Sequence, residues 1–274
     1  MTEQYLPAWS EPFIGERRSA LAHLPPFGRL DREWAWGGSD GTGVLVAIID
    51  SGVEPDHPAV GGRVIESMVV DLTGEEPRVL PETEAIDVVG HGTACAGIIH
   101  GLAPGAEFVS VRVLGPDNRG KGAAFAAGLD WAIQRGANVV NLSLSSKSDA
   151  MFGIFHDLAD RAYFANVLMV SAANNVPGPS YPSLFSSVVS VAAHDVADPF
   201  VYYYNPEPPV EFGAYGVDVD IAWRAGSRII ATGNSFAAPH VAGLATLIRS
   251  KHRELTPFEL KAILAATADD AREP

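Results

Sequence analysis

The chain has 274 residues, of which 47% are hydrophobic, and its formal net charge is −14 at pH 7. This composition can supply one large core, and the negative charge argues against nucleic acid and anionic membranes as partners. The start of the chain lacks the apolar core of a signal peptide, and no apolar run approaches the roughly 20 residues of a membrane span. The single cysteine, Cys95, excludes an internal disulfide. We therefore expect a cytoplasmic protein.

Strands and helices alternate along the predicted chain. The apolar run 44–49 ends at Asp50 and a glycine turn, which is typical of a strand buried on both faces. His91 lies between two glycines and opens a helix of small residues. Further strands are predicted over 108–113, 138–143, 167–171 and 188–192, and further helices over 123–135, 150–165 and, after a capping box at Thr256, to about residue 266. This order indicates an α/β fold with a mostly parallel central sheet and helices on both faces.

Another small-residue helix is predicted in segment 233–243, where Ser235 stands near the helix start. A serine in that position has its hydroxyl near unpaired backbone N–H groups and the positive end of the helix dipole, which favour negative charge on a reacting group. Because a helix tolerates proline in its first turn, we expect Pro239 there. Taken alone, the segment favours an ordinary N-cap serine over a nucleophile.

An acid, an imidazole and a hydroxyl thus occur at the ends of three elements, as Asp50, His91 and Ser235. Ligands of open α/β sheets bind beyond the carboxyl ends of the strands, where Asp50 would lie. The acid can fix the tautomer of the imidazole, the imidazole can accept a proton, and the hydroxyl can attack a carbonyl. Together the three residues favour nucleophilic catalysis over three separate structural roles.

With these motifs in the order Asp, His, Ser, the chain resembles the subtilisin-like serine peptidase family from Gly43 to about Ala268. The segments that carry the resemblance are Asp50-Ser51-Gly52, Gly90-His91-Gly92-Thr93 and Gly233-Asn234-Ser235 through Pro239. The resemblance implies a three-layer subtilisin-like fold and no cofactor. It also implies a peptidase domain at 43–274 and an N-terminal segment at 1–42 that packs on this domain, with no full prodomain.

The segment Val170 to Asn175 resembles the strand end that supplies the family's oxyanion-hole asparagine. Alignment on Ala172-Ala173 gives this role to Asn175, together with the backbone N–H of Ser235. Asn174 then stands where the family usually has glycine, and it remains a second candidate. Asparagine is the non-glycine residue that best tolerates a left-handed backbone, so the replacement is physically mild.

Two further segments resemble the strands that bind substrate, which implies a peptide or protein substrate in an extended conformation. These segments are Ser143-Leu144-Ser145 and Gly120-Lys121-Gly122, and we add Asn174 to the expected substrate-binding residues. Ser145 replaces a usual glycine, which predicts a narrower first pocket or one that a side chain enters less deeply. Val176 stands where many relatives have glutamate, which weakens the case for a basic residue before the scissile bond.

We expect no bound metal. The chain runs from Gly101 to Pro104 with no room for the calcium-binding loop that many relatives insert there, and His57 and His240 are predicted to be packing residues. Cys95 follows His91 by one helical turn. It is either a small buried residue or a thiol whose modification would impair activity. The aromatic, proline-rich segment 200–209 is expected to be a packed surface loop or a rim that selects substrates.

The combined prediction is a serine endopeptidase of narrow specificity that matures a precursor peptide or a partner protein inside the cell. Two alternatives stay open: general intracellular protein turnover, and a catalytically silent scaffold of the same fold that binds peptides. The sequence does not indicate an oligomeric state.

Overall fold

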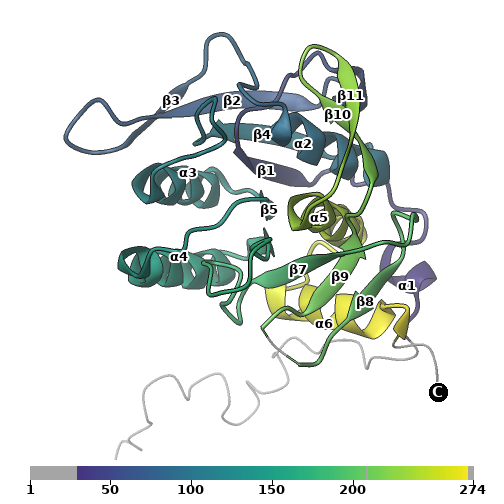
Figure 1. The fold of residues 1–274 in the computed structure, drawn as a ribbon. Helices are drawn as coiled ribbons and strands as arrows, with labels where there is room; N and C mark the ends of the chain where they lie inside the picture. Colours follow the sequence, from purple (N-terminus) through teal and green to yellow (C-terminus); the bar gives the residue numbers. More distant parts are fainter. Residues whose placement is uncertain (1–29, 208, 271–274) are drawn as a thin grey trace, which may run out of the picture. The chain divides into compact units, whose positions relative to one another are not determined.

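The computed structural model describes residues 30–207 and 209–270, so most of the predicted N-terminal segment 1–42 lies outside the described residues. A nine-stranded sheet runs through the described part, and helices cover both of its faces (Figure 1). Its strands follow the spatial order β3–β2–β4–β1–β5–β6–β7–β9–β8. They are β1 (Leu45–Asp50), β2 (Val64–Asp71), β3 (Arg78–Pro81), β4 (Glu107–Arg112), β5 (Val139–Leu142), β6 (Leu168–Ala172), β7 (Val189–His194), β8 (Tyr202–Tyr204) and β9 (Phe212–Tyr215).

Parallel pairing dominates this sheet. Neighbours from β2 to β9 are parallel, and within the described part of this sheet only the edge strands β3 and β8 pair in the antiparallel direction. In register, Asp50 of β1 lies opposite Arg112 of β4, and Leu142 of β5 lies opposite Ser171 of β6. The carboxyl ends of β1, β5 and β6 therefore meet at one edge of the sheet. The predicted α/β fold with a mostly parallel sheet is confirmed.

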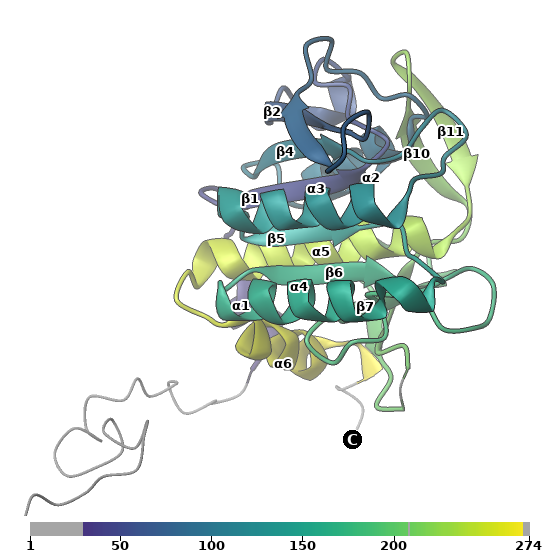
Figure 2. The same ribbon diagram turned by 90° about the vertical axis from the view of Figure 1, so that its left-hand side faces the viewer.

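Helices lie on both faces of the sheet (Figure 2). One layer holds α3 (Gly122–Arg135) and α4 (Phe152–Phe164), and the other holds α2 (His91–Leu102) and α5 (Asn234–Lys251). The shorter helices are α1 (Arg32–Trp36), α6 (Pro257–Thr267), η3 (Pro58–Val60) and η4 (Asp149–Met151). The capping box predicted at the start of α6 is present, between Thr256 and Glu259. Among the described residues, none of the helices combines the length and the apolarity that crossing a bilayer requires.

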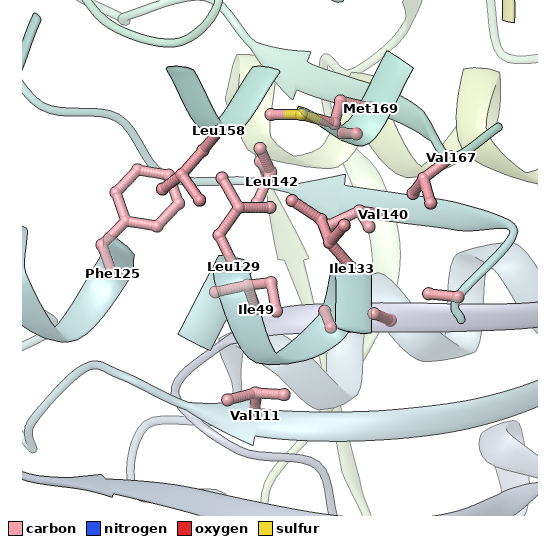
Figure 3. Packing of buried hydrophobic residues seen from close by; sticks show 14 of the residues in the cluster. Ile49, Val111, Phe125, Leu129, Ile133, Val140, Leu142, Leu158, Val167 and Met169 are labelled. Atoms are coloured by element: carbon pink, nitrogen blue, oxygen red, sulfur yellow. The ribbon is translucent and has the colours of Figure 1, made fainter. Parts of the chain in front are cut away.

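A large hydrophobic core fills the space between the sheet and the layer of α3 and α4 (Figure 3). The strands contribute Ile49, Val111, Val140, Leu142 and Met169, and the helices contribute Phe125, Leu129, Ile133 and Leu158. Burial of one such side chain contributes about 1.5–3 kcal/mol, so this core holds the strands in fixed register. The loops that follow β1, β5 and β6 therefore begin at strands whose positions are fixed.

A separate hairpin of β10 (Val219–Trp223) and β11 (Ser227–Ala231) packs against α2. Its contacts form a small second core in which Val219 and Ile221 meet Ala94 of α2 and Phe236 of α5. The hairpin was not predicted. It covers the outer side of the helices that begin at His91 and Asn234.

The segment 200–209 is only in part the loop that the sequence predicts. Residues 202–204 form the edge strand β8, and Tyr202 is completely buried. The Tyr202 hydroxyl lies 2.9 Å from the carbonyl oxygen of Leu264 and 2.7 Å from Thr267 Oγ1 in α6. An aromatic run is equally consistent with an exposed contact surface and with a buried edge strand. The contacts between Tyr202 and α6 show that it forms a buried edge strand here.

The described part of the N-terminal segment contacts α5 and α6. Arg32 of α1 forms an ion pair with Asp269 at 2.6 Å, and the ring of Trp34 stacks on His252 with centroids 4.4 Å apart. Lys251 Nζ donates to the carbonyl oxygen of Gly37 at 2.9 Å. Residues 32–37 therefore lie along the carboxyl end of α5.

Candidate active site

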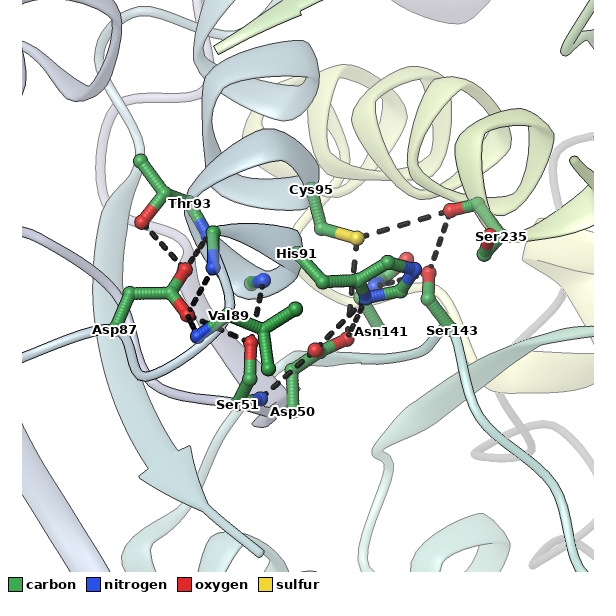
Figure 4. Close-up of polar contacts among 12 residues, drawn as sticks. Asp50, Ser51, Asp87, Val89, His91, Thr93, Cys95, Asn141, Ser143 and Ser235 are labelled. Atoms are coloured by element: carbon green, nitrogen blue, oxygen red, sulfur yellow. Dashed lines mark hydrogen bonds and ion pairs between the residues drawn. The ribbon is translucent and has the colours of Figure 1, made fainter. Parts of the chain in front are cut away.

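The carboxylate of Asp50 and the imidazole of His91 form a hydrogen-bonded pair (Figure 4). Asp50 is the last residue of β1 and His91 is the first of α2, and both are buried. His91 Nδ1 lies 2.8 Å from Asp50 Oδ1 and 2.9 Å from Asp50 Oδ2. The Asp50 carboxylate accepts a hydrogen bond from Nδ1–H, so Nε2 of the neutral ring is left as the proton acceptor.

The segment after Asp50 and the first turn of α2 can approach closely because glycines lie at their contact. A Cβ placed on Gly92 would lie 2.0 Å from the carbonyl oxygen of Gly52, which no side chain can tolerate. Gly90, the N-cap of α2, has φ 108°, in the left-handed region that favours glycine. The glycines on both sides of His91 are thus required by the geometry of the pair.

The surroundings raise the pKa of His91. Burial by itself would lower this pKa, but the charge of Asp50, its hydrogen bond and the charge of Asp87 act in the opposite direction and prevail. The site therefore stabilises the imidazolium that forms when the ring takes up a proton. Burial, followed by the charge of Asp50, raises the pKa of Cys95 well above its ordinary value, so this thiol stays protonated.

Ser235 is the second residue of α5, and its side chain faces the same cleft as His91. Pro239 is the sixth residue of this helix, so the expectation of a first-turn proline is wrong. Proline has no N–H for the carbonyl four residues earlier, which leaves the Ser235 carbonyl free for other donors. Ser143 Oγ donates to this oxygen at 2.8 Å, and Cys95 Sγ lies 3.7 Å from it. The ends of β5 and α2 thereby hold the first turn of α5.

Cys95 lies directly beneath the Asp50–His91 pair. Its sulfur is 4.0 Å from Asp50 Oδ2, and the residue is completely buried. Cys95 lies one turn after His91 in α2, as the sequence predicts. His57 and His240 are both buried, as expected of packing residues.

The two asparagines after β6 point in different directions. Asn175 Oδ1 accepts from the backbone N–H of Asn234 at 2.9 Å, which fixes its amide at the start of α5. A Cβ placed on Gly233 would lie 3.2 Å from Ser235 Oγ and 3.8 Å from Asn175 Nδ2, so the hydroxyl and this amide border the same space. Asn174 Oδ1 accepts from the N–H of Val176 at 2.8 Å, and its Nδ2 lies 3.5 Å from Ser145 Oγ.

Asn174 does not have the left-handed backbone that would explain an exchange with glycine. Asparagine is instead accommodated there because its side chain closes a turn onto Val176 and reaches Ser145. The Asn174 side chain therefore lies inside the cleft.

One cavity of about 430 Å³ joins these residues. The sequence-predicted residues that line it are His91, Ser235, Asn175, Gly120, Lys121, Gly122, Ser143, Leu144, Ser145 and Asn174. Asp50 lies beneath it, behind His91. Asn118, Arg119, Phe125 and Ser146 also line the cavity and were not predicted. The carboxyl ends of β5 and β6 and the start of α3 thus form one cleft.

The most important residue that the sequence analysis missed is Asp87. This buried residue lies four positions before His91. Its carboxylate accepts hydrogen bonds from three backbone N–H groups and two hydroxyls. No local capping signal marks Asp87, because the N-cap position directly before α2 is Gly90.

Among the described residues, Asp50, His91 and Cys95 are the group whose atoms are close enough to hold a metal, within 4.8 Å of one another. The imidazole and the carboxylate already use these atoms for each other. The connection from α2 to β4, residues 103–106, has only alanine, proline and glycine and provides no carboxylate for calcium. We assign no metal to either place.

The chain is similar to known proteins in both sequence and fold. The model that describes the subtilase family matches residues 41–274. The chain is 32% identical to thermitase of Thermoactinomyces vulgaris over 263 residues, which are 88% of this chain and 86% of thermitase. It is 32% identical to a thermostable alkaline protease of Halalkalibacterium halodurans over 239 residues, 83% of this chain and 63% of that protein. The crystal structure of a cold adapted subtilisin-like serine proteinase superimposes with a TM-score of 0.69 at 27% identity, covering 86% of this chain and 87% of the other.

Proposed function

We propose, on the premise that the chain belongs to the subtilase family and is a subtilisin-like serine endopeptidase, that Ser235, His91, Asp50 and Asn175 carry its reaction. Ser235 Oγ attacks the carbonyl carbon of the scissile bond while His91 Nε2 takes the hydroxyl proton. His91 then gives this proton to the leaving amine, and water releases the acyl group by the same steps. Asp50 keeps the imidazole in the productive tautomer.

Asn175 Nδ2 and the backbone N–H of Ser235 are proposed to stabilise the oxyanion of the tetrahedral intermediate. The observation that supports this assignment is the orientation of the two asparagines. The Asn175 amide is fixed at the start of α5 by the Asn234 N–H, whereas the Asn174 amide reaches Ser145.

Fluorophosphonate labelling tests the proposal against the silent-scaffold alternative. We expect rapid covalent labelling of the intact protein and none of a Ser235→Ala variant. Equal labelling of the two would refute Ser235 as the nucleophile. Absence of labelling in an intact, folded sample would favour the scaffold.

The narrow specificity is proposed from one contact across the cleft. Ser145 Oγ follows β5, Asn174 Nδ2 follows β6, and the two atoms are 3.5 Å apart. A substrate side chain that enters between these segments must displace the contact. We therefore propose that the residue directly before the scissile bond is small, such as glycine, alanine or serine.

Cleavage of a proteome-derived peptide library would test this specificity. We expect small residues before the cleaved bond, and a Ser145→Gly variant should accept larger ones with a smaller gain for the small ones. A wild-type preference for leucine, phenylalanine or lysine at this position would contradict the proposal.

The physiological role follows from the same restriction. We propose maturation of a precursor peptide or partner protein in the cytoplasm, and the alternative is general intracellular turnover. The same library distinguishes the two roles, because cleavage at many unrelated sequences would refute the processing role and support general turnover. Cell fractionation tests the compartment, and a pool found outside the cell would contradict the cytoplasmic assignment.

A further inference from the structure

We propose that Asp87 is a positioning residue that holds the Asp50 loop against the first turn of α2 and whose negative charge supports the imidazolium formed on His91. The inference rests on the roles proposed above for Asp50 and His91. Asp87 does not itself touch the substrate cleft. Its contacts with the two segments that carry the pair lead to this assignment (Figure 4).

Five hydrogen bonds converge on the Asp87 carboxylate, whose residue is only 6% exposed. Oδ1 accepts from Ser51 Oγ at 2.7 Å, from the N–H of Val89 at 3.0 Å and from the N–H of Gly90 at 2.7 Å. Oδ2 accepts from the N–H and the hydroxyl of Thr93 at 2.8 and 2.7 Å. All five donors are neutral, so they stabilise the charge of the carboxylate without cancelling it.

Ser51 extends this arrangement to both members of the pair. Its hydroxyl donates to Asp87 and accepts from the N–H of Gly92 at 3.1 Å, next to His91. Its backbone N–H donates to Asp50 Oδ1 at 2.8 Å. The path from Asp87 through Ser51 therefore reaches the residue beside His91 and the carboxylate that orients it. A misplacement of about 1 Å in such a pair can cost roughly 100-fold in rate.

The charge of Asp87 has a separate effect. The titratable groups that face His91 are Asp50 from β1, Cys95 from α2 and Asp87 from the loop before α2. Cys95 stays neutral because its pKa is raised, so the two carboxylates supply the negative charge around the ring. The charge of Asp87 raises the pKa of His91 in addition to the effect of Asp50. Without it, His91 should give up its proton at a lower pH.

A merely structural helix cap is the competing interpretation, because an acid before a helix satisfies free N–H groups and contributes about 1 kcal/mol of stability. Asp71 offers a matched control for it. This half-buried carboxylate accepts from the N–H and the hydroxyl of Thr73, both at 2.9 Å, as Asp87 does from Thr93. It lies outside the residues that line the cleft. Asp71→Asn should therefore leave kcat/KM and its pH profile unchanged.

The test compares Asp87→Asn, Thr93→Val and Asp71→Asn by kcat, KM, melting temperature and the pH profile of kcat/KM. For Asp87→Asn we expect a fall in kcat of about 10- to 100-fold with little change in KM, and an acid limb shifted to lower pH. Thr93→Val keeps the charge, so it should lower kcat less and leave the acid limb in place. An Asp87→Asn enzyme that melts earlier but keeps kcat and the acid limb would reduce Asp87 to a cap and overturn the proposal.

Ser51→Ala covers the case in which Asp87→Asn does not fold, because it removes the link to Gly92 and keeps the charge. It should lower kcat without moving the acid limb, and an unchanged kcat would overturn the positioning role. Fluorophosphonate labelling of the wild type is measured in parallel. A wild type that does not label refutes the proposed function, whereas a wild type that labels beside variants with unaltered profiles refutes only the role of Asp87.

Discussion

Acid should destabilise this protein through His240, one helical turn beyond Ser235. The side chain is 4% exposed, its Nδ1 donates to the carbonyl oxygen of Phe236 at 2.8 Å, and its ring lies 5.5 Å from that of Tyr215. Burial lowers the pKa of His240 from 6.5 to about 4. Below pH 6.5 the unfolded chain therefore binds a proton that the native state refuses, and stability falls as the pH falls. The loss amounts to about 3 kcal/mol once the pH is below 4, at 1.36 kcal/mol per pKa unit.

Urea unfolding at pH 7 and pH 4.5 measures this loss. Both proteins should carry Ser235→Ala to prevent self-digestion, and the His240→Gln variant serves as the non-titrating reference. At pH 4.5 we expect His240 to have cost the parent about 2.5 kcal/mol that the variant does not lose. What counts is the change between the two pH values, because the substitution also alters packing. A parent and a variant that lose stability in parallel would show that His240 is not held neutral by burial.

Three more results are expected. Asn175→Ala should lower kcat by about 100- to 1,000-fold with little change in KM, a magnitude taken over from the equivalent donor of subtilisin, a member of the same family; a large loss for Asn174→Ala and none for Asn175→Ala would reverse the assignment. Millimolar EDTA should leave the melting temperature and activity essentially unchanged, whereas a melting temperature that fell by many degrees and returned with calcium would reveal a structural ion. Tyr202→Phe should lower the free energy of unfolding by about 1–2 kcal/mol, because a buried hydroxyl is lost, and leave kcat/KM unchanged. A change in substrate preference would revive segment 200–209 as a rim.

The parallel half of the sheet could be predicted because its strands are buried on both faces. β1, β4, β5 and β6 consist mainly of apolar residues, and nearly all of their positions are buried. Amphipathic helices follow β4 and β5, as α3 and α4. The strands at the edges carry weaker signals. Val219–Trp223 is a short strand in which only Asp220 is exposed, while its partner Ser227–Ala231 is mostly exposed and has no apolar period. These two strands form because they pair with each other and pack on α2, which local sequence does not report.

The residues proposed for catalysis could be predicted from the sequence, whereas the residues that position them could not. Asp50, His91 and Ser235 each lie at the end of a strand or the start of a helix. The sequence around each residue therefore predicts its position in the fold. Pro239 was visible too, but its effect was misjudged, because the carbonyl that it leaves free is taken up by Ser143, 92 positions earlier in the chain. Asp87 binds Ser51 over a separation of 36 residues. Because partners of this kind meet only after the strands have assembled, a side chain that positions a catalytic group is identified from its contacts, and Asp87→Asn tests that identification more directly than any change within the triad.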